Sequence, residues 1–193
     1  MRSITAEEIT TLNTEEFKGQ IFVVDSQDEA DKAVEYLSGF TDLGFDTETR
    51  PSFRKGKLHG VSLIQLATDE RCYLFRLNWT GSSASLIQLL SDARIRKIGL
   101  SLKDDFTNIN RRMKFTPRGF IDLQKIVSGH NIADASLQKI YAILFRKRIS
   151  KSQRLSNWES EKLSEAQKNY AALDAWACLK IYKKLNYSSD VSA

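Results

Sequence analysis

Two acidic residues separated by one position, Asp46 and Glu48, end an apolar run that begins at Leu43. If this run is a strand, both carboxylates project from the same face, because side chains alternate with a period of two. Paired carboxylates repel each other, which raises their pKa values unless a cation neutralises them. Hard divalent cations such as Mg²⁺ accept oxygen ligands of this kind. The pair therefore indicates a metal site at the mouth of a sheet; the alternative is a strand end with two solvated acids.

Two further segments carry acids in positions that could do chemistry. Asp104 and Asp105 follow an apolar strand-like run, 97–100, and stand where a helix begins. Either acid could simply cap that helix, since a carboxylate at a helix N-terminus needs no further function. Tyr170 and Asp174 are four residues apart in a long helical pattern, so the phenol and the carboxylate share one face. The alternative there is a partly buried tyrosine beside an exposed acid.

These three segments are more informative together than separately. They supply four acids and one phenol, from a strand, a helix start and a long helix. Two-metal catalysis requires a cage of this kind, in which carboxylates hold ions about 4 Å apart and the ions clamp the attacking and leaving oxygens of an in-line displacement.

The elements that must position these residues alternate between strand-like and helix-like periodicity. Ser26 followed by Glu29 predicts a capping box, and the polar TDER between two strand-like runs predicts a hairpin. Strands are predicted at 21–25, 43–48, 61–67, 72–77 and 97–100. A helix is predicted after Ser26, with Ala30, Ala33, Val34 and Leu37 on one face, and further helices at about 84–90, 105–113, 123–127, 137–145 and 165–185. This order predicts an α/β fold whose mixed sheet, an antiparallel meander plus parallel strands, is flanked by helices. The sequence contains neither a Gly-rich dinucleotide loop nor a Walker-type loop.

The composition is that of a globular protein, with 193 residues, 41% hydrophobic and 27% charged. We expect an accessory helical segment at 1–20, one main domain at 21–187 and a flexible tail at 188–193. Two cysteines and two histidines are too few for a disulfide framework or a Cys/His zinc cluster. No run is apolar enough for a membrane span or a signal core, so we expect a cytoplasmic or otherwise intracellular protein without membrane contact.

The acidic segments, in their order along the chain, resemble the motifs of the DEDD superfamily of 3′–5′ exonucleases in its tyrosine-containing (DEDDy) branch. The similarity is greatest to the Werner-type exonuclease domain and the ribonuclease D group. FDTE matches the first motif, GLSLKDDF the second and QKNYAALDAWACLKIY the third. The segments GKLHGVSLIQLAT and SNWESEKLSEAQK also match the family's sequence between these motifs. The resemblance extends from about Leu43 to Leu185. It implies an RNase H-like domain that hydrolyses the terminal phosphodiester of DNA or RNA and releases nucleoside 5′-monophosphates.

The resemblance also implies roles for individual residues. Asp46 would contact both of two divalent ions, Mg²⁺ or Mn²⁺, and Glu48 and Asp174 would complete the site that holds the attacking water. Asp105 would support the second ion through water, and its register from the preceding strand favours it over Asp104. Tyr170 would orient the nucleophilic water.

Substrate contacts are expected beside this cage. Thr47 and Thr49 stand where the family contacts the terminal nucleotide, and Trp158 could either stack on the substrate or pack in the core. Asp122 is interpreted as structural. The net charge of +5 includes two basic clusters. They predict a surface that contacts phosphates or, alternatively, a solvated charged face. The clusters are Arg50, Arg54, Lys55 and Lys57, and Arg146, Lys147, Arg148, Lys151 and Arg154.

Two rival functions remain open at this point. The first is a catalytically weak nucleic-acid-binding module of the same fold, and the second is an endonuclease of that fold. The sequence does not distinguish DNA from RNA, because recognition of a 2′-hydroxyl depends on the shape of the pocket. It also does not identify a helicase or any other protein partner.

Overall fold

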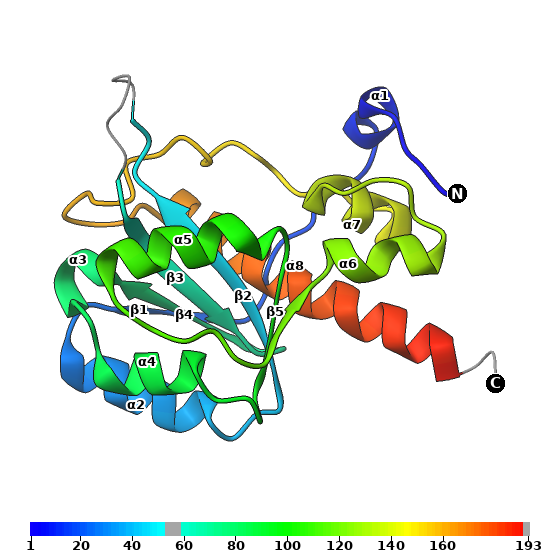
Figure 1. Ribbon diagram of the computed structural model, residues 1–193. Coiled ribbons are helices and arrows are strands. Elements are labelled where there is room, and N and C mark those ends of the chain that lie inside the picture. Colours follow the sequence, from blue (N-terminus) through cyan, green and yellow to red (C-terminus); the bar gives the residue numbers. More distant parts are fainter. Residues whose placement is uncertain (53–58, 191–193) are drawn as a thin grey trace.

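The computed structural model describes residues 1–52 and 59–190, and its centre is a sheet of six strands in the order β1-β4-β3-β2-β5-β6 (Figure 1). β3 runs antiparallel to its neighbours β2 and β4, while the other pairs are parallel. The mixed sheet and the predicted hairpin between β3 and β4 are therefore confirmed. The strands are β1 (Gln20–Val24), β2 (Asp42–Thr49), β3 (Val61–Ala67), β4 (Arg71–Arg76), β5 (Arg96–Gly99) and β6 (Phe120–Asp122).

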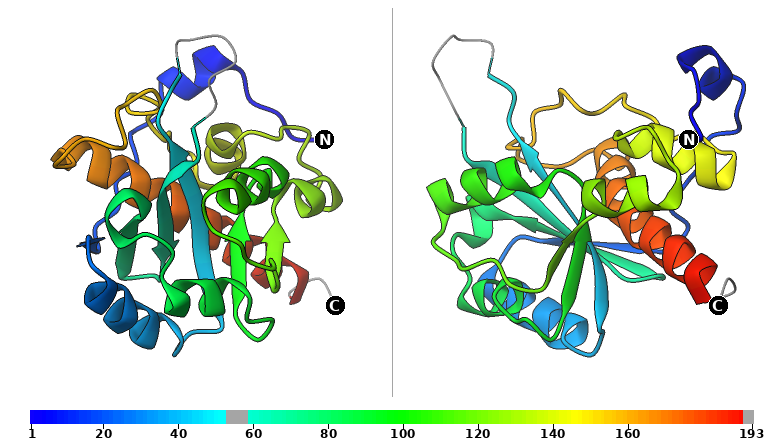
Figure 2. Two further views of the ribbon diagram at one scale, coloured as in Figure 1. Left: turned by 60° about the vertical axis from the view of Figure 1, so that its left-hand side comes forward. Right: turned by 45° about the vertical axis from the view of Figure 1, so that its right-hand side comes forward.

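Helices cover both faces of the sheet (Figure 2). α2, α4 and α5 share one hydrophobic core with the sheet, and α6, α7 and α8 share the other. The helical elements are α1 (Ala6–Thr10), α2 (Gln27–Leu37), α3 (Leu77–Thr80), α4 (Ala84–Leu90), α5 (Leu102–Arg112), α6 (Gln124–Val127), η1 (Ser128–His130), α7 (Leu137–Phe145) and α8 (Glu165–Asp190). Within the described residues, no helix is long and apolar enough to cross a membrane.

Local signals in the sequence mark several element boundaries correctly. Ser26 forms the predicted capping box with Glu29: its hydroxyl accepts from the Glu29 amide, and the Glu29 carboxylate accepts from the Ser26 amide at 3.1 Å. Helix α4 has the predicted bounds, and so does α7. Capping groups lie within a few residues of the helix they stabilise, which is why such boundaries can be predicted without tertiary information.

Other boundaries differ from the prediction. The polar first 20 residues form a helix only at Ala6–Thr10, because the following Thr- and Asn-containing residues are poor helix formers. β6 has three half-buried residues, too few to show a strand period, and it was not predicted. α8 continues to Asp190, so the tail predicted at 188–193 is helical in its first part, and 191–193 lie outside the described residues.

Gly44 allows α8 to lie directly against β2. A Cβ atom at Gly44 would be 2.0 Å from the carbonyl oxygen of Ala175 and 2.8 Å from its carbonyl carbon. Both atoms belong to the backbone of α8, which cannot rotate away as a flexible side chain could. Asp174 immediately precedes Ala175, so this close approach also brings the Asp174 carboxylate to the sheet.

We therefore expect Gly44→Ala to lower the free energy of unfolding by about 3 kcal/mol or more, the upper part of the usual range for overpacking. Urea denaturation followed by circular dichroism would measure it. Gly129→Ala is the matched control, because no atom lies within 4 Å of a Cβ placed there. Equal stability of the two variants would show that α8 moves freely relative to β2.

Candidate active site

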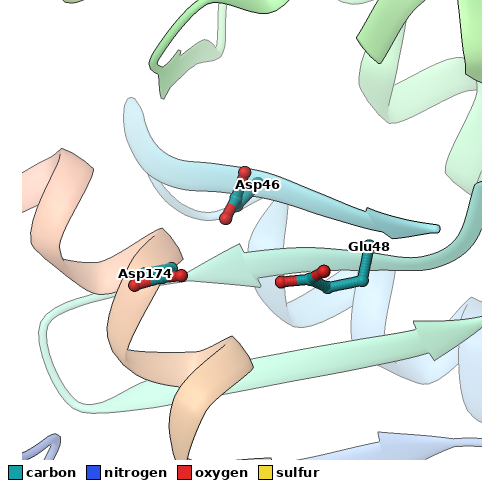
Figure 3. A group of neighbouring side chains, drawn as sticks. All are labelled: Asp46, Glu48 and Asp174. Atoms are coloured by element: carbon teal, nitrogen blue, oxygen red, sulfur yellow. The ribbon is translucent and has the colours of Figure 1, made fainter. Parts of the chain in front are cut away.

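Three carboxylates from two elements meet at one point of the sheet (Figure 3). Asp46 and Glu48 project from β2, and Asp174 projects toward them from α8. One oxygen atom of each carboxylate lies within 4.8 Å of the others. The tertiary structure thus brings together the first and third acidic segments of the sequence.

Burial and mutual repulsion raise the pKa values of these acids. Glu48 is 8% exposed and Asp174 is 7% exposed. Burial, together with the charges of Asp46, Asp174 and Asp105, raises the pKa of Glu48 to about 10. Burial also raises the pKa of Asp46 well above its ordinary value, and the nearby charges add to the shift.

Asp174 has additional partners that oppose this effect. Burial raises its pKa to about 7, whereas a hydrogen bond from Tyr170 and the charge of Lys151 act in the opposite direction. Tyr170 lies one helical turn before Asp174, as predicted from the spacing. Burial, followed by the charges of Asp174 and Glu48, raises the pKa of the Tyr170 phenol, so this group stays protonated at neutral pH and can donate a hydrogen bond.

The donor set fits a hard divalent cation. Closely spaced, buried carboxylates that lack a neutralising charge are unfavourable, and cations such as Mg²⁺ and Mn²⁺ prefer oxygen ligands. Asp46, Glu48 and Asp174 each present one such oxygen to the same small volume. These three residues are therefore the candidates for holding a metal ion.

Asp105 approaches from α5, on the opposite side of β2 from α8. Its Oδ1 accepts a hydrogen bond from the Thr47 hydroxyl at 2.5 Å. Burial raises its pKa to about 6, and the hydrogen bond from Thr47 works against that rise. Asp104 is exposed. The structure thus directs Asp105, rather than Asp104, toward β2, but Asp105 lies outside the group of three acids that share the 4.8 Å limit.

Neither of these acids caps α5, in contrast to the structural alternative considered for the sequence. The carboxylate of Asp122, at the end of β6, accepts from the amides of Ser101 at 2.9 Å and Leu102 at 3.2 Å. Asp122 therefore satisfies the first amides of α5 from a neighbouring strand. The interpretation of Asp122 as structural agrees with these contacts.

A cavity of about 160 Å³ adjoins the carboxylates. Asp46, Tyr170 and Asp174 line it together with residues of the chain between α7 and α8, namely Ile149, Ser150, Lys151 and Arg154. Leu100, Leu137, Gln138 and Cys178 complete the lining. Two residues of the predicted basic clusters, Lys151 and Arg154, thus lie at the cavity.

Other residues of the predicted basic clusters lie away from the cavity or outside the described residues. Arg50 pairs with Glu159 at 3.4 Å, near the end of β2. Lys147 pairs with Glu15 at 2.8 Å, and the Arg148 side chain donates to the carbonyl of Leu12 at 3.0 Å. Both therefore contact the N-terminal segment and not the carboxylates. Arg54, Lys55 and Lys57 lie outside the described residues.

The residues expected to contact the substrate differ in burial: Thr47 and Thr49 are half-buried, whereas Trp158 is fully buried. Thr49 is half-buried at an irregularity in the pairing of β2 with β3, beside Glu48. Thr47 points to Asp105, as described above. Trp158 is fully buried in the core, and its ring centroid is 6.0 Å from that of Tyr170. This placement favours the packing alternative for Trp158, because a stacking platform needs an exposed ring face.

One polar residue near the site was missed in the sequence. Gln65 lies directly opposite Asp46 in the β2–β3 register and is completely buried. Neither its amide nitrogen nor its amide oxygen has a hydrogen-bond partner among the described residues. The available signal is the Gln65 amide, which together with Ser62 interrupts the apolar residues of VSLIQLA. Its partner across the sheet depends on strand register and could not be predicted from the sequence.

Comparison with known proteins agrees with this geometry. Residues 21–188 match the family of 3′–5′ exonucleases. The chain is 33% identical over 156 residues to the bifunctional 3′–5′ exonuclease/ATP-dependent helicase WRN of Mus musculus, covering 78% of this chain and 11% of that protein. It is 31% identical over 185 residues to a 3′–5′ exonuclease of Arabidopsis thaliana, covering 88% of this chain and 64% of that one. The chain thus spans less than two thirds of either relative.

Solved structures show the same fold. The Nibbler EXO domain of Aedes aegypti aligns with a TM-score of 0.81 at 22% identity over 89% of both chains. Escherichia coli RNase D aligns with a TM-score of 0.78 at 22% identity, over 88% of this chain and 45% of that one. The mixed sheet with its helical layers is therefore the RNase H-like fold of the RNase D type, as the sequence predicted. The family match over most of its length shows that this chain belongs to the 3′–5′ exonucleases, a family of phosphodiester hydrolases.

Proposed function

We propose that this chain is a metal-dependent 3′–5′ exonuclease that removes nucleotides one at a time from the 3′ end of DNA or RNA. The observation that carries the proposal is the meeting of Asp46, Glu48 and Asp174 within 4.8 Å, with raised pKa values, beside a cavity. A purely structural role would not retain three mutually repelling, largely buried acids, because each costs stability without a counterion.

We assign the metal-holding role to Asp46, Glu48 and Asp174, with Asp105 supporting a second ion. Two divalent cations, Mg²⁺ or Mn²⁺, when bound, supply Lewis acidity and make hydroxide accessible near neutral pH. The hydrogen bond between Asp105 and Thr47 holds the Asp105 carboxylate at the edge of the site. Asp105 is thus placed to support a second ion, and its charge adds to the repulsion felt by Asp46 and Glu48 when no cation is bound.

The chain's own residues then orient the reacting groups. Tyr170 stays protonated and donates its hydrogen bond to Asp174, so its hydroxyl oxygen lies at the cavity beside the carboxylates, where it can accept from a water molecule and orient it. Lys151 and Arg154 line the same cavity and offer positive charge to phosphate oxygens. Attack by water oxygen on the last phosphorus breaks the bond to the 3′-oxygen of the preceding nucleotide. The products are a nucleoside 5′-monophosphate and a strand shortened by one residue.

A panel of labelled oligonucleotides tests this proposal. With Mg²⁺ or Mn²⁺, a 5′-labelled DNA or RNA strand should give a ladder of products shortened one residue at a time, and a 3′-labelled strand should release labelled mononucleotide from the start. EDTA should stop both reactions. Degradation of circular substrates would support an endonuclease instead, and binding without any metal-dependent hydrolysis would support a nucleic-acid-binding module.

Tyr170→Phe should slow hydrolysis by about 100-fold, the lower end of what a positioned acid–base group contributes, while metal affinity changes little. The variant lacks only the hydroxyl, and the aromatic ring still packs beside Trp158. Single-turnover kinetics and calorimetric titration with Mn²⁺ would measure the two effects separately. A loss of metal affinity comparable to the loss of rate would instead assign Tyr170 to the support of Asp174.

A further inference from the structure

The N-terminal segment pairs with the chain that follows α7. We call residues Leu12–Phe17 the strap; they precede the residues that match the exonuclease family, which begin at 21. The amide of Glu15 donates to the carbonyl of Arg148 at 2.8 Å, and the amide of Arg148 donates to the carbonyl of Asn13 at 3.0 Å. Thr14 and Arg148 thus form a parallel bridge. The strap therefore binds both the amide and the carbonyl group of Arg148.

Glu15 anchors the strap with an almost completely buried carboxylate. Glu15 is 6% exposed. Its Oε2 accepts from the Tyr141 hydroxyl at 2.6 Å and from Lys180 Nζ at 3.3 Å, and its Oε1 accepts from Lys147 Nζ at 2.8 Å. Burial alone would raise the pKa of Glu15, but these partners hold it at about 2, so the group is ionised at all physiological pH values. One carboxylate thereby joins the strap to α7, to α8 and to the chain between them.

Aromatic contacts fasten the end of the strap to α8. The ring centroid of Phe17 is 5.7 Å from that of Trp176. Lys180, one of the partners of Glu15, lies 4.3 Å from the centroid of the same Trp176 ring. Figure 1 shows the consequence: the N-terminal chain lies beside α7, on the same side of the molecule as the chain that leads from α7 toward α8.

The residues immediately after Arg148 form the cavity wall described above. We call Ile149–Lys151 the rim; all three line the cavity together with Asp46, Tyr170 and Asp174. The carbonyl of Ile149 also accepts a hydrogen bond from the side chain of Gln138 on α7. The rim is thus held on one side by α7 and is preceded directly by the residues that the strap and Glu15 contact.

We propose that Glu15 is a positioning residue of the active site: through Lys147 and Arg148 it fixes the rim, so that Lys151 faces the carboxylates and the bound 3′ end. This inference rests on the proposed exonuclease function, but the placement of the rim itself can be tested separately. Neutralising Glu15 leaves Lys147 and Lys180 without their common partner and loosens the strap at position 148. The rim then samples positions in which Lys151 lies farther from the terminal phosphate.

Glu15→Gln should raise KM for a 3′-ended oligonucleotide by about tenfold, with a smaller change in kcat, which is the low end of what outer partners of a site contribute. Hydrogen exchange over 147–154 should accelerate in the same variant. Glu16→Gln is the charge control, because the Glu16 side chain is 65% exposed. Lys147→Met removes the other partner of the ion pair and should change KM in the same direction if Glu15→Gln folds poorly.

A stability-matched control separates positioning from general loosening. Leu86 is completely buried in the core on the other face of the sheet, so Leu86→Val or Leu86→Ala can be chosen to match the drop in Tm of Glu15→Gln. Unchanged KM and unchanged exchange at 147–154 in Glu15→Gln would overturn the inference, and so would equal changes in the Leu86 variant. If the wild-type chain hydrolyses nothing, the proposed function fails, and the exchange measurement alone still decides whether Glu15 fixes the rim.

Discussion

Asp46→Asn is expected to reduce 3′–5′ hydrolysis by at least about 1,000-fold, the scale reached when a major electrostatic group of an active site is lost. The same substitution should raise the Tm of the metal-free protein. The reason for the opposite signs is that Asp46 lies within 4.8 Å of Glu48 and Asp174, so its charge serves a cation but repels its neighbours when no cation is present. Oligonucleotide degradation and thermal unfolding in EDTA would measure the two effects.

The matched control for this prediction is Asp104→Asn. Asp104 is exposed and adjoins Asp105 in sequence, so the change removes one nearby negative charge without touching the three central carboxylates. Activity within about twofold of the wild type is expected, as for most surface substitutions. Retained activity in Asp46→Asn, or in the double variant with Glu48→Gln, would contradict the assignment of these acids.

The second large effect is stabilisation by metal that depends on pH. The folded-state pKa of Glu48 is raised from 4.5 to about 10, and that of Asp174 from 3.8 to about 7. Folded-state pKa values above the unfolded ones mean that the folded state binds protons more tightly. The stability that these groups contribute is therefore fully present below about pH 4 and is lost as pH rises, through about 7 for Asp174 and toward about 10 for Glu48.

Bound Mg²⁺ or Mn²⁺ should oppose this loss. At 100 times the dissociation constant, a ligand adds about 2.7 kcal/mol of stability, which corresponds to a rise in Tm of about 5 to 10 °C for a chain of this size. We expect that rise at pH 8 and little rise at pH 5, where protons already neutralise the site and compete with the metal. Differential scanning fluorimetry across this pH range, with and without metal, would measure it.

Asp46→Asn serves as the control for the metal effect, because it removes a ligand and should abolish most of the shift. An equal rise in Tm at both pH values would contradict the prediction, since it would place the metal away from the titrating carboxylates. A metal-free Tm that rises between pH 5 and pH 8 would contradict the raised pKa values themselves.

Much of the site could be predicted because its residues are paired by local geometry. Asp46 and Glu48 share a face since a strand alternates with a period of two, and Tyr170 and Asp174 share a face since a helix turns every 3.6 residues. The capping box at Ser26 is local in the same sense. Such relations depend on a few neighbouring backbone angles, so residue types and spacing are enough to predict them.

The relations that were not predicted all join residues far apart in sequence. Gln65 faces Asp46 because of strand register, and Asp122 caps α5 from a strand only three residues long. Glu15 meets Lys147 and Lys180 across more than 130 positions of the chain. Spacing carries no information on such pairs, because the distance between them depends on how the layers pack.

The sequence by itself therefore determined most of the element order, the mixed α/β sheet and the identity of the acids, since these depend on periodicity and on the chemistry of carboxylates. Only the tertiary structure decided which acids meet and how strongly they interact. Gly44 permits α8 to touch β2, so that Asp174 reaches Asp46 and Glu48, and burial raises their pKa values. Strand register already favoured Asp105 over Asp104, and packing added the hydrogen bond from Thr47 to Asp105. The burial of Trp158 was decided by packing alone, because exposure is a property of the folded layers and not of the residues.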